Sequence, residues 1–239
     1  KNNPPKIIAI TGSNGKTTVT SMVGAMCRAA GKETLVAGNI SPAVLDVLLQ
    51  RKGKHPAVWV LELSSFQLET TSSLCADAAT VLNISEDHMD RYDDMGEYIA
   101  AKARIFRADG HGGVQVLNRD DADSAAMALL ERKHITFGIN TPPPGAEDWG
   151  VEIDNADTWL VQGKQRVLQA NELLVEGLHN VSNALAALAL CRAIDLPLPP
   201  LLDALRNFKG LPHRVEAVAE IRPLGVGINL LPHAVREMA

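Results

Sequence analysis

A Gly-rich turn near the start of the chain joins a short apolar run to a helical pattern. Residues 7–10 (Ile-Ile-Ala-Ile) are apolar and typical of a buried strand. The Gly-rich turn follows at residues 11–18 (Thr-Gly-Ser-Asn-Gly-Lys-Thr-Thr), and apolar residues then recur at helical spacing from Val19 to Ala30. A buried strand that passes through a turn into a helix is the first half of a βαβ unit. We therefore expect an α/β fold.

The same alternation of strands and helices continues along the chain to Gly138. Further apolar runs, each typical of a buried strand, occur at residues 35–37, 58–61, 79–82, 114–117 and 135–137. Helical patterns lie between them, one opening at Pro42 and others at 95–107 and 121–131. This order predicts a mostly parallel sheet with helices on both faces, as in P-loop proteins.

The pattern changes after Gly138. Short alternating stretches at residues 149–169, separated by Asp, Asn and Gly, predict a small antiparallel meander at the edge of the domain. Two helices are expected after it, at 180–194 and 200–208.

The composition excludes several classes of partner. The 239 residues include 23 Lys and Arg against 28 Asp and Glu, a formal net charge of −5, with no basic run. We therefore expect neither nucleic acid nor an anionic membrane as a partner. No apolar run reaches the ~18 residues of a membrane-spanning helix. The three cysteines, Cys27, Cys75 and Cys191, fit neither a disulfide framework nor a zinc site, which predicts a cytoplasmic location.

The Gly-rich turn has the residue types that bind a polyphosphate. Glycines let backbone N–H groups approach phosphate oxygens, and the following helix adds the partial positive charge of its N-terminus. Lys16 can reach the β- and γ-phosphates, and the Thr17 hydroxyl can bind Mg²⁺. The strict P-loop spacing is not met, because Ile10 stands where its first glycine would be. An ordinary turn before a helix is the alternative, and a plain P-loop kinase is a weaker one.

Two further segments place polar groups at the ends of expected strands. Glu62 follows the apolar run 58–61, where a carboxylate can bind the metal that bridges nucleotide phosphates. His88 lies in an acidic loop after the run 79–82 and can bind metal or phosphate. The alternatives are a capping or ion-pairing role for Glu62 and a solvated acidic loop around His88.

Lys102 lies on the apolar stripe of the helix expected at 95–107, with Tyr98 and Ile105. A lysine on a buried face must extend its amine to solvent, pair with another group, or lose its charge. A neutral amine can react with CO₂ to give a carbamate, an anionic oxygen ligand for Mg²⁺. Spacing alone does not choose between these alternatives.

Asn180 and Asn183 are three residues apart at the start of the helix expected at 180–194, so their side chains face the same way. They can contact an adenine edge or a phosphate, and helix capping is the competing interpretation.

Taken together, these motifs resemble the Mur ligases, ATP-dependent amide-bond-forming enzymes of peptidoglycan synthesis and hence of cell wall formation. The resemblance covers about residues 5–217. Its motifs occur in the family's order at residues 11–18, 38–40, 61–71, 87–92, 101–102, 179–184 and 210–214. Residues 62–70 (Glu-Leu-Ser-Ser-Phe-Gln-Leu-Glu-Thr) and 88–92 (His-Met-Asp-Arg-Tyr) select the branch that adds D-glutamate to UDP-N-acetylmuramoyl-L-alanine.

The resemblance implies roles for individual residues. ATP would contact Gly12, Asn14, Gly15, Lys16, Thr17, Thr18, Asn180, Asn183 and Arg214. One Mg²⁺ would be bound by Thr17 and Glu62, and a second by His88 and a carbamylated Lys102. The UDP-sugar peptide would contact Asn39, Ser64 and His88. Lys16, Glu62, His88 and Lys102 would be the catalytic residues, and the substrates would be UDP-N-acetylmuramoyl-L-alanine, D-glutamate and ATP.

The resemblance also sets the expected domain organisation. Residues 1–211 are expected to form the central ATP-binding domain of a monomeric ligase, and residues 212–239 a truncated or foreign tail. The tail is similar to a short segment of flavin-dependent monooxygenases, but it is too short to bind FAD, so we expect no flavin. Because the family's other two domains are not evident, we do not expect full ligase activity from this chain alone. A nucleotide-binding module without activity, or another Mur or folylpolyglutamate synthase-like ligase, are the alternatives.

Overall fold

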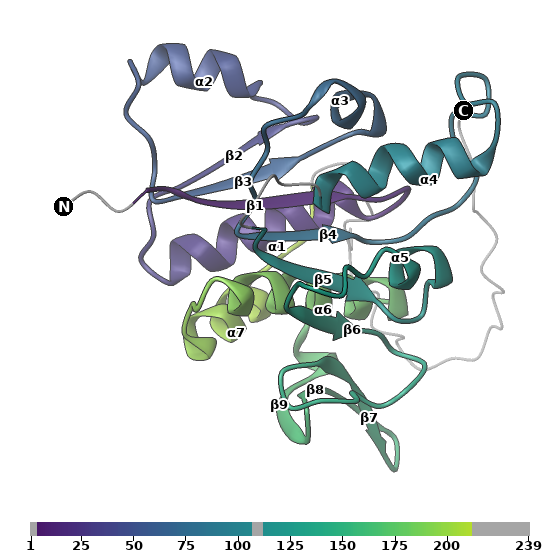
Figure 1. The fold of residues 1–239 in the computed structure, drawn as a ribbon. Helices are drawn as coiled ribbons and strands as arrows, with labels where there is room; N and C mark the ends of the chain where they lie inside the picture. Colours follow the sequence, from purple (N-terminus) through teal and green to yellow (C-terminus); the bar gives the residue numbers. More distant parts are fainter. Residues whose placement is uncertain (1–3, 107–111, 212–239) are drawn as a thin grey trace, which may run out of the picture.

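The computed structural model describes residues 4–106 and 112–211, and within them a single mixed sheet is the centre of the fold. Its nine strands lie in the order β2-β3-β1-β4-β5-β6-β7-β8-β9 (Figure 1). The strands are β1 (Lys6–Thr11), β2 (Thr34–Gly38), β3 (Val58–Glu62), β4 (Ala78–Val81), β5 (Val114–Asn118), β6 (His134–Phe137), β7 (Trp149–Asp154), β8 (Asp157–Gln162) and β9 (Gln165–Gln169). Strands β1 to β6 pair with their neighbours in parallel. Strands β7, β8 and β9 form an antiparallel meander at one edge. The predicted fold class is confirmed.

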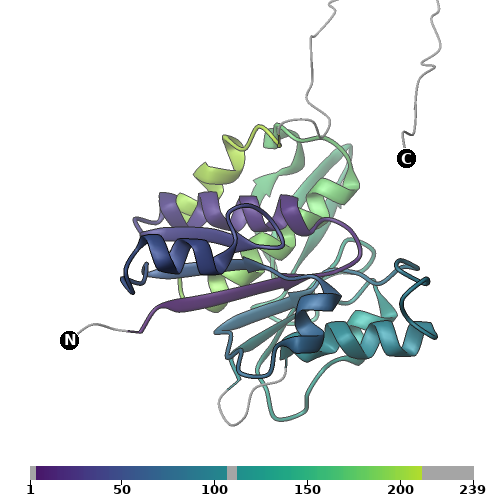
Figure 2. The ribbon, with the colours of Figure 1, turned by 90° about the horizontal axis from the view of Figure 1, so that it is seen from above.

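Helices cover both faces of the sheet. They are α1 (Lys16–Ala29), α2 (Val44–Gln50), α3 (Ser65–Thr70), α4 (Met95–Ala103), α5 (Ala122–Ala126), α6 (Leu178–Ala193) and α7 (Leu198–Arg206), with 3₁₀ helices η1 (Arg104–Phe106) and η2 (Ala170–Glu172). Helices α1, α6 and α7 pack together on one face, and α4 lies on the other (Figure 2). None of the helices within the described ranges is long and apolar enough to cross a membrane.

Alternation along the central strand β1 divides the hydrophobic core into two layers. Ile8 and Ile10 pack with α1, α6 and α7, whereas Ala9 between them packs with Trp59 on the opposite face. Successive side chains of a strand point to opposite faces, so both faces of β1 are buried. Strand β1 therefore ends inside the protein, with its carboxyl end leading into the Gly-rich turn.

Two elements differ from the predicted pattern. The helix expected at 121–131 is only the short α5, because the buried side chain of Gln115 binds the chain beyond it: the Gln115 amide donates to Met127 O and accepts from Leu129 N. These bonds replace the ones that a continued helix would make. Helix α3 was not predicted, and it begins with a capping box between Ser64 and Gln67.

Candidate active site

The Gly-rich turn connects β1 to α1 at the carboxyl edge of the parallel strands. Gly12 (φ +152°) lies against β4, where an added Cβ would come within 3.0 Å of Leu82 Cβ. Gly15 (φ +81°) is the N-cap of α1, and no side chain in the described structure caps this helix. The N-terminus of α1 therefore has no side-chain cap among the described residues, and the helix dipole favours an anionic ligand there.

A second segment, Asn83–Ser85 after β4, fixes the outer side of the turn. The Asn83 side chain accepts from Asn14 N at 2.8 Å and donates to Asn14 O at 3.1 Å. Ser13 N donates to Asn83 O, and the Ser13 hydroxyl bonds both the N–H and the carbonyl of Ser85. Sequence reasoning missed the role of Asn83, although its position directly after a buried strand was a usable signal.

Two lysines from different elements meet at the turn. Lys16 Nζ, at the start of α1, donates to Gly12 O at 2.9 Å and Ser13 O at 3.0 Å. Lys102 Nζ, in α4, donates to the same Gly12 oxygen at 3.0 Å. Residues 86 positions apart are therefore brought together at one carbonyl.

Lys102 is 2% exposed, so its amine is buried together with its stem, an outcome that the spacing had left open. Its ammonium lies over the ring of Tyr98, 4.6 Å from the centroid. Burial, and secondarily the nearby charge of Lys16, lower the pKa of Lys102 to about 8. The amine does not extend to solvent, so that alternative is excluded.

Glu62 ends β3 and lines a small cavity of about 310 Å³ together with Lys16, Thr17 and Asn39. The Glu62 side chain is buried, and its Oε1 accepts from Asn39 Nδ2 at 3.1 Å. Its Oε2 is buried without a hydrogen-bond partner among the described residues. A buried carboxylate oxygen beside a hydroxyl and an ammonium is suited to bind a cation.

A large cavity of about 570 Å³ lies on the other side of the Gly-rich turn. Asn14 and Gly15 line both cavities. Thr18, Asn180 and Asn183 also line the large one, and Leu174 and Leu211 contribute apolar surface. Asn183 lies so close to the turn that a Cβ on Gly15 would be 2.7 Å from its Oδ1. The two asparagines predicted for nucleotide contact thus lie beside the residues predicted for phosphate contact.

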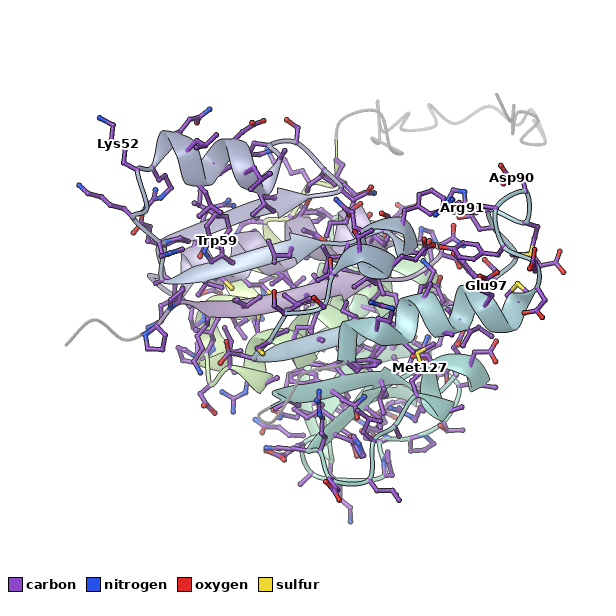
Figure 3. All side chains as sticks on the ribbon, turned by 45° about the horizontal axis from the view of Figure 1, so that its top comes forward. Lys52, Trp59, Asp90, Arg91, Glu97 and Met127 are labelled. Atoms are coloured by element: carbon purple, nitrogen blue, oxygen red, sulfur yellow. The ribbon has the colours of Figure 1, made fainter. Side chains whose placement is uncertain are left out.

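Two expected site residues are not brought into this group. His88 packs on Phe66 with ring centroids 4.8 Å apart and lines neither cavity. Its loop projects near the end of α4 where Glu97 lies, as the labelled Asp90 and Arg91 show (Figure 3). The Ser64 hydroxyl is engaged in capping α3, and Arg214 lies outside the described residues. Within the described ranges no three His, Cys, Asp or Glu side chains form a metal-binding group.

Comparison with known proteins identifies relatives along most of the chain. The Mur ligase middle domain matches residues 10–191. The chain is 62% identical over 222 residues to UDP-N-acetylmuramoylalanine–D-glutamate ligase of Nitrosomonas europaea, which covers 91% of this chain and 47% of that protein. The enzyme of the same name from Chromobacterium violaceum is 56% identical over 217 residues, covering 90% and 46%. The chain thus spans about half the length of the curated relatives it matches.

A solved structure supports the same assignment. The structure of UDP-N-acetylmuramoyl-L-alanyl-D-glutamate–2,6-diaminopimelate ligase superimposes with a TM-score of 0.74 at 25% identity, over 92% of this chain and 49% of that one. The matches in sequence and in structure cover the same part of the chain, which includes the Gly-rich turn. This chain therefore belongs to the Mur ligase family through its middle domain.

Proposed function

We propose that this chain is the ATP-binding part of a ligase that joins D-glutamate to UDP-N-acetylmuramoyl-L-alanine in peptidoglycan synthesis. The relatives at 56–62% identity bear the name of that enzyme. The observation that carries the proposal is the small cavity, where Lys16, Thr17 and Glu62 lie together beside the N-terminus of α1. An ammonium, a hydroxyl and a carboxylate at a helix N-terminus are the groups that bind a nucleotide phosphate and its metal.

The two cavities divide the nucleotide between them. The N–H groups of the Gly-rich turn and Lys16 bind the β- and γ-phosphates, with Thr17 and Thr18 in the first turn of α1. The nucleoside occupies the large cavity, where Asn180 and Asn183 supply polar contacts. Asn14 and Gly15 line both spaces and therefore lie where the nucleoside and phosphates join. We also propose that Arg214, which lies outside the described residues, contacts the nucleotide.

Thr17 and Glu62 fit a bound Mg²⁺. The unpartnered Glu62 Oε2 is the observation that supports this fit, because a buried carboxylate is stable only when it is paired or binds a cation. When bound, Mg²⁺ neutralises phosphate charge. A second Mg²⁺ at His88 and a carbamylated Lys102 stays a prediction, because Lys102 is buried beside the turn whereas His88 packs on Phe66 and lines neither cavity.

Carbamylation of Lys102 is the chemical modification that the proposal includes. A pKa of about 8 leaves part of the amine neutral at neutral pH. The neutral nitrogen would attack the carbon of CO₂ and lose one proton, giving a carbamate. Incubation with ¹³CO₂ followed by ¹³C NMR tests this step, with Lys102→Met as the control that lacks the amine.

The residues serve a reaction in two steps. A carboxylate oxygen of UDP-N-acetylmuramoyl-L-alanine bonds to the γ-phosphorus of ATP as the bond to the ADP oxygen breaks. The D-glutamate amine then bonds to the acyl carbon, phosphate leaves, and the amine loses a proton. Lys16 stabilises the charge that develops on the transferred phosphoryl group. Asn39 and Ser64 are proposed to contact the UDP-sugar peptide. A monomeric state and a cytoplasmic location remain predictions.

Two experiments test this function. Isothermal titration of the chain with ATP and Mg²⁺ should give binding that Lys16→Ala weakens at least ten-fold, and equal affinities would contradict the phosphate site. For the ligase step, residues 5–211 replace the matching segment of the Nitrosomonas europaea enzyme, which is 62% identical. The chimera should form the D-glutamyl amide and its Lys16→Ala form should not, whereas a well-folded but inactive chimera would argue for a binding module.

A further inference from the structure

One face of α4 contacts the Gly-rich turn at two adjacent points. Tyr98 and Lys102 are four residues apart, so their side chains lie on the same face of the helix. The Tyr98 hydroxyl lies 3.0 Å from Ser13 Oγ, and Lys102 Nζ lies 3.0 Å from Gly12 O. Both side chains are buried. Neighbouring residues of α4 therefore contact neighbouring residues of the turn.

The hydrogen bonds of Ser13 determine which hydroxyl donates. Ser13 Oγ donates its one proton to Ser85 O and accepts from Ser85 N, each at 3.0 Å. A serine hydroxyl has one donor and two acceptor positions, so its remaining bond must accept a proton from Tyr98. A tyrosine hydroxyl carries the proton that this bond requires. With the bond from Tyr98, the Ser13 hydroxyl makes all three of the hydrogen bonds that it can form.

The ring of Tyr98 has a second contact. Its face lies 4.6 Å from Lys102 Nζ, a cation–π distance, and its other neighbour is Tyr92, with ring centroids 5.3 Å apart. The hydroxyl of Tyr92 points elsewhere and donates to Glu69. Of these two tyrosines, it is Tyr98 that contacts both the turn and the buried lysine.

We propose that Tyr98 is a positioning residue of the nucleotide site, whose hydroxyl fixes the Gly-rich turn through Ser13 and whose ring fixes the amine of Lys102. Turn and helix then move as one unit, and the backbone that faces the phosphates is formed before the nucleotide binds. The proposal rests on the proposed function only in taking this turn as the phosphate site.

Amide hydrogen exchange on the full chain without nucleotide tests the positioning directly. Three amides report on the turn: Ser13 N and Asn14 N, which donate to Asn83, and Ser85 N, which donates to Ser13 Oγ. In Tyr98→Phe, which keeps the ring, these amides should exchange ~5-fold faster, the effect of one lost hydrogen bond. Tyr92→Phe is the matched control and should leave their exchange unchanged.

Ser13→Ala removes this bond together with both bonds to Ser85, so the Asn14 amide should exchange at least as fast as in Tyr98→Phe. Unchanged rates at that amide in Tyr98→Phe would overturn the proposal. So would a uniform increase across the whole protein, which indicates general destabilisation.

Nucleotide affinity supplies the second measurement. Tyr98→Phe should weaken ATP binding ~5-fold and leave adenosine binding unchanged, because Ser13, the residue that Tyr98 contacts, lines the small cavity of the phosphates and not the large cavity of the nucleoside. Equal weakening of both ligands would contradict the proposal. Should the wild-type chain bind no ATP while Tyr98→Phe still speeds exchange at the turn alone, the proposed function fails and the positioning role stands.

Discussion

Lys16 and Lys102 donate to the same carbonyl oxygen, that of Gly12, at 2.9 and 3.0 Å. Two ammonium groups this close repel each other, and one of them is buried. The Gly12 carbonyl accepts from both, the Tyr98 ring lies 4.6 Å from Lys102 Nζ, and the charge of Asp87 raises the pKa of Lys102, so all three stabilise the buried ammonium. An incoming polyphosphate would meet the ammonium of Lys16 already in place in the small cavity, so less reorganisation accompanies binding.

The buried charge of Lys102 makes stability depend on pH. Below about pH 8, Lys102 is charged in both the folded and the unfolded chain, and the full penalty of burying its charge is present. Between about pH 8 and 10.5 the folded protein loses this proton first, so the unfolded chain binds more protons and stability rises with pH. Relative to Lys102→Met, the wild type should gain up to about 3 kcal/mol over this range.

The measurement is urea unfolding of both proteins at pH 7 and pH 10, in buffers free of CO₂ so that no carbamate forms. The quantity of interest is the change with pH in the stability difference, because bonds lost in the Met variant affect both values alike. A difference that stays constant between the two pH values would show that burial does not perturb this lysine.

Removal of Mg²⁺ should affect ATP binding through Glu62. In Glu62→Gln the side chain keeps its size but loses the negative charge, so Mg²⁺ should no longer strengthen ATP binding, and affinity with Mg²⁺ should fall about ten-fold or more. Without Mg²⁺ the variant should be at least as stable as the wild type, because a buried carboxylate whose Oε2 has no hydrogen-bond partner among the described residues is replaced by a neutral amide. Titrations with ATP in Mg²⁺ and in EDTA measure the effect.

Glu69→Gln is the matched control for this variant. The Glu69 carboxylate is engaged with Tyr92 and Arg91, and it lines neither cavity. Its ATP affinity should keep the wild-type dependence on Mg²⁺. If Glu62→Gln behaves like this control, Glu62 does not bind the metal.

Alanine substitutions at the two glycines that flank α1 distinguish the effect of backbone strain from the effect of a damaged nucleotide site. Gly15 begins the helix with φ +81°, and Gly31 follows its end with φ +74°. Alanine at either position should lower stability by about 1–2 kcal/mol, the usual penalty of this conformation. Only Gly15→Ala should also weaken ATP binding, because its Cβ would press on Asn183, whereas nothing lies within 4 Å of a Cβ at Gly31. Equal ATP affinities in the two variants would contradict the placement of the phosphates at Gly15.

The sequence predicted the residues of the site better than their contacts. The spacing at Gly15-Lys16-Thr17 and the carboxylate after a buried strand were local signals, and both lead to the small cavity. The stripe that contains Lys102 placed it on a buried face of the helix, but did not decide whether its amine extends to solvent or, as found, reaches Gly12. Pairings such as Asn83 with Asn14, or Tyr98 with Ser13, depend on which strands become neighbours, and no local pattern encodes that.

For the fold, the hydrophobic pattern predicted the parallel strands and the meander. Strands buried on both faces are continuous apolar runs, and strands buried on one face alternate between apolar and polar residues. The length of α5 was wrong for a different reason. Residues 121–131 have a helical pattern, but the outcome is decided by Gln115, a polar residue in the middle of strand β5. Local propensity was overridden by a tertiary hydrogen bond.

Gln115→Leu should therefore destabilise the fold without harming the site. The Gln115 amide donates to Met127 O at 3.1 Å and accepts from Leu129 N at 2.8 Å, and leucine would leave both backbone groups without these bonds. Unfolding in urea should show a loss of about 1–2 kcal/mol, since each lost hydrogen bond contributes about 0.5–1.5 kcal/mol and these backbone groups are part-buried, so water can replace a share of the bonding. Gln165→Leu, on the exposed edge strand β9, should change stability by less than about 0.5 kcal/mol. ATP affinity should stay at the wild-type value in both variants, because neither glutamine lines a cavity. A Gln115→Leu protein as stable as the wild type would mean that the chain after Ala126 does not depend on this side chain.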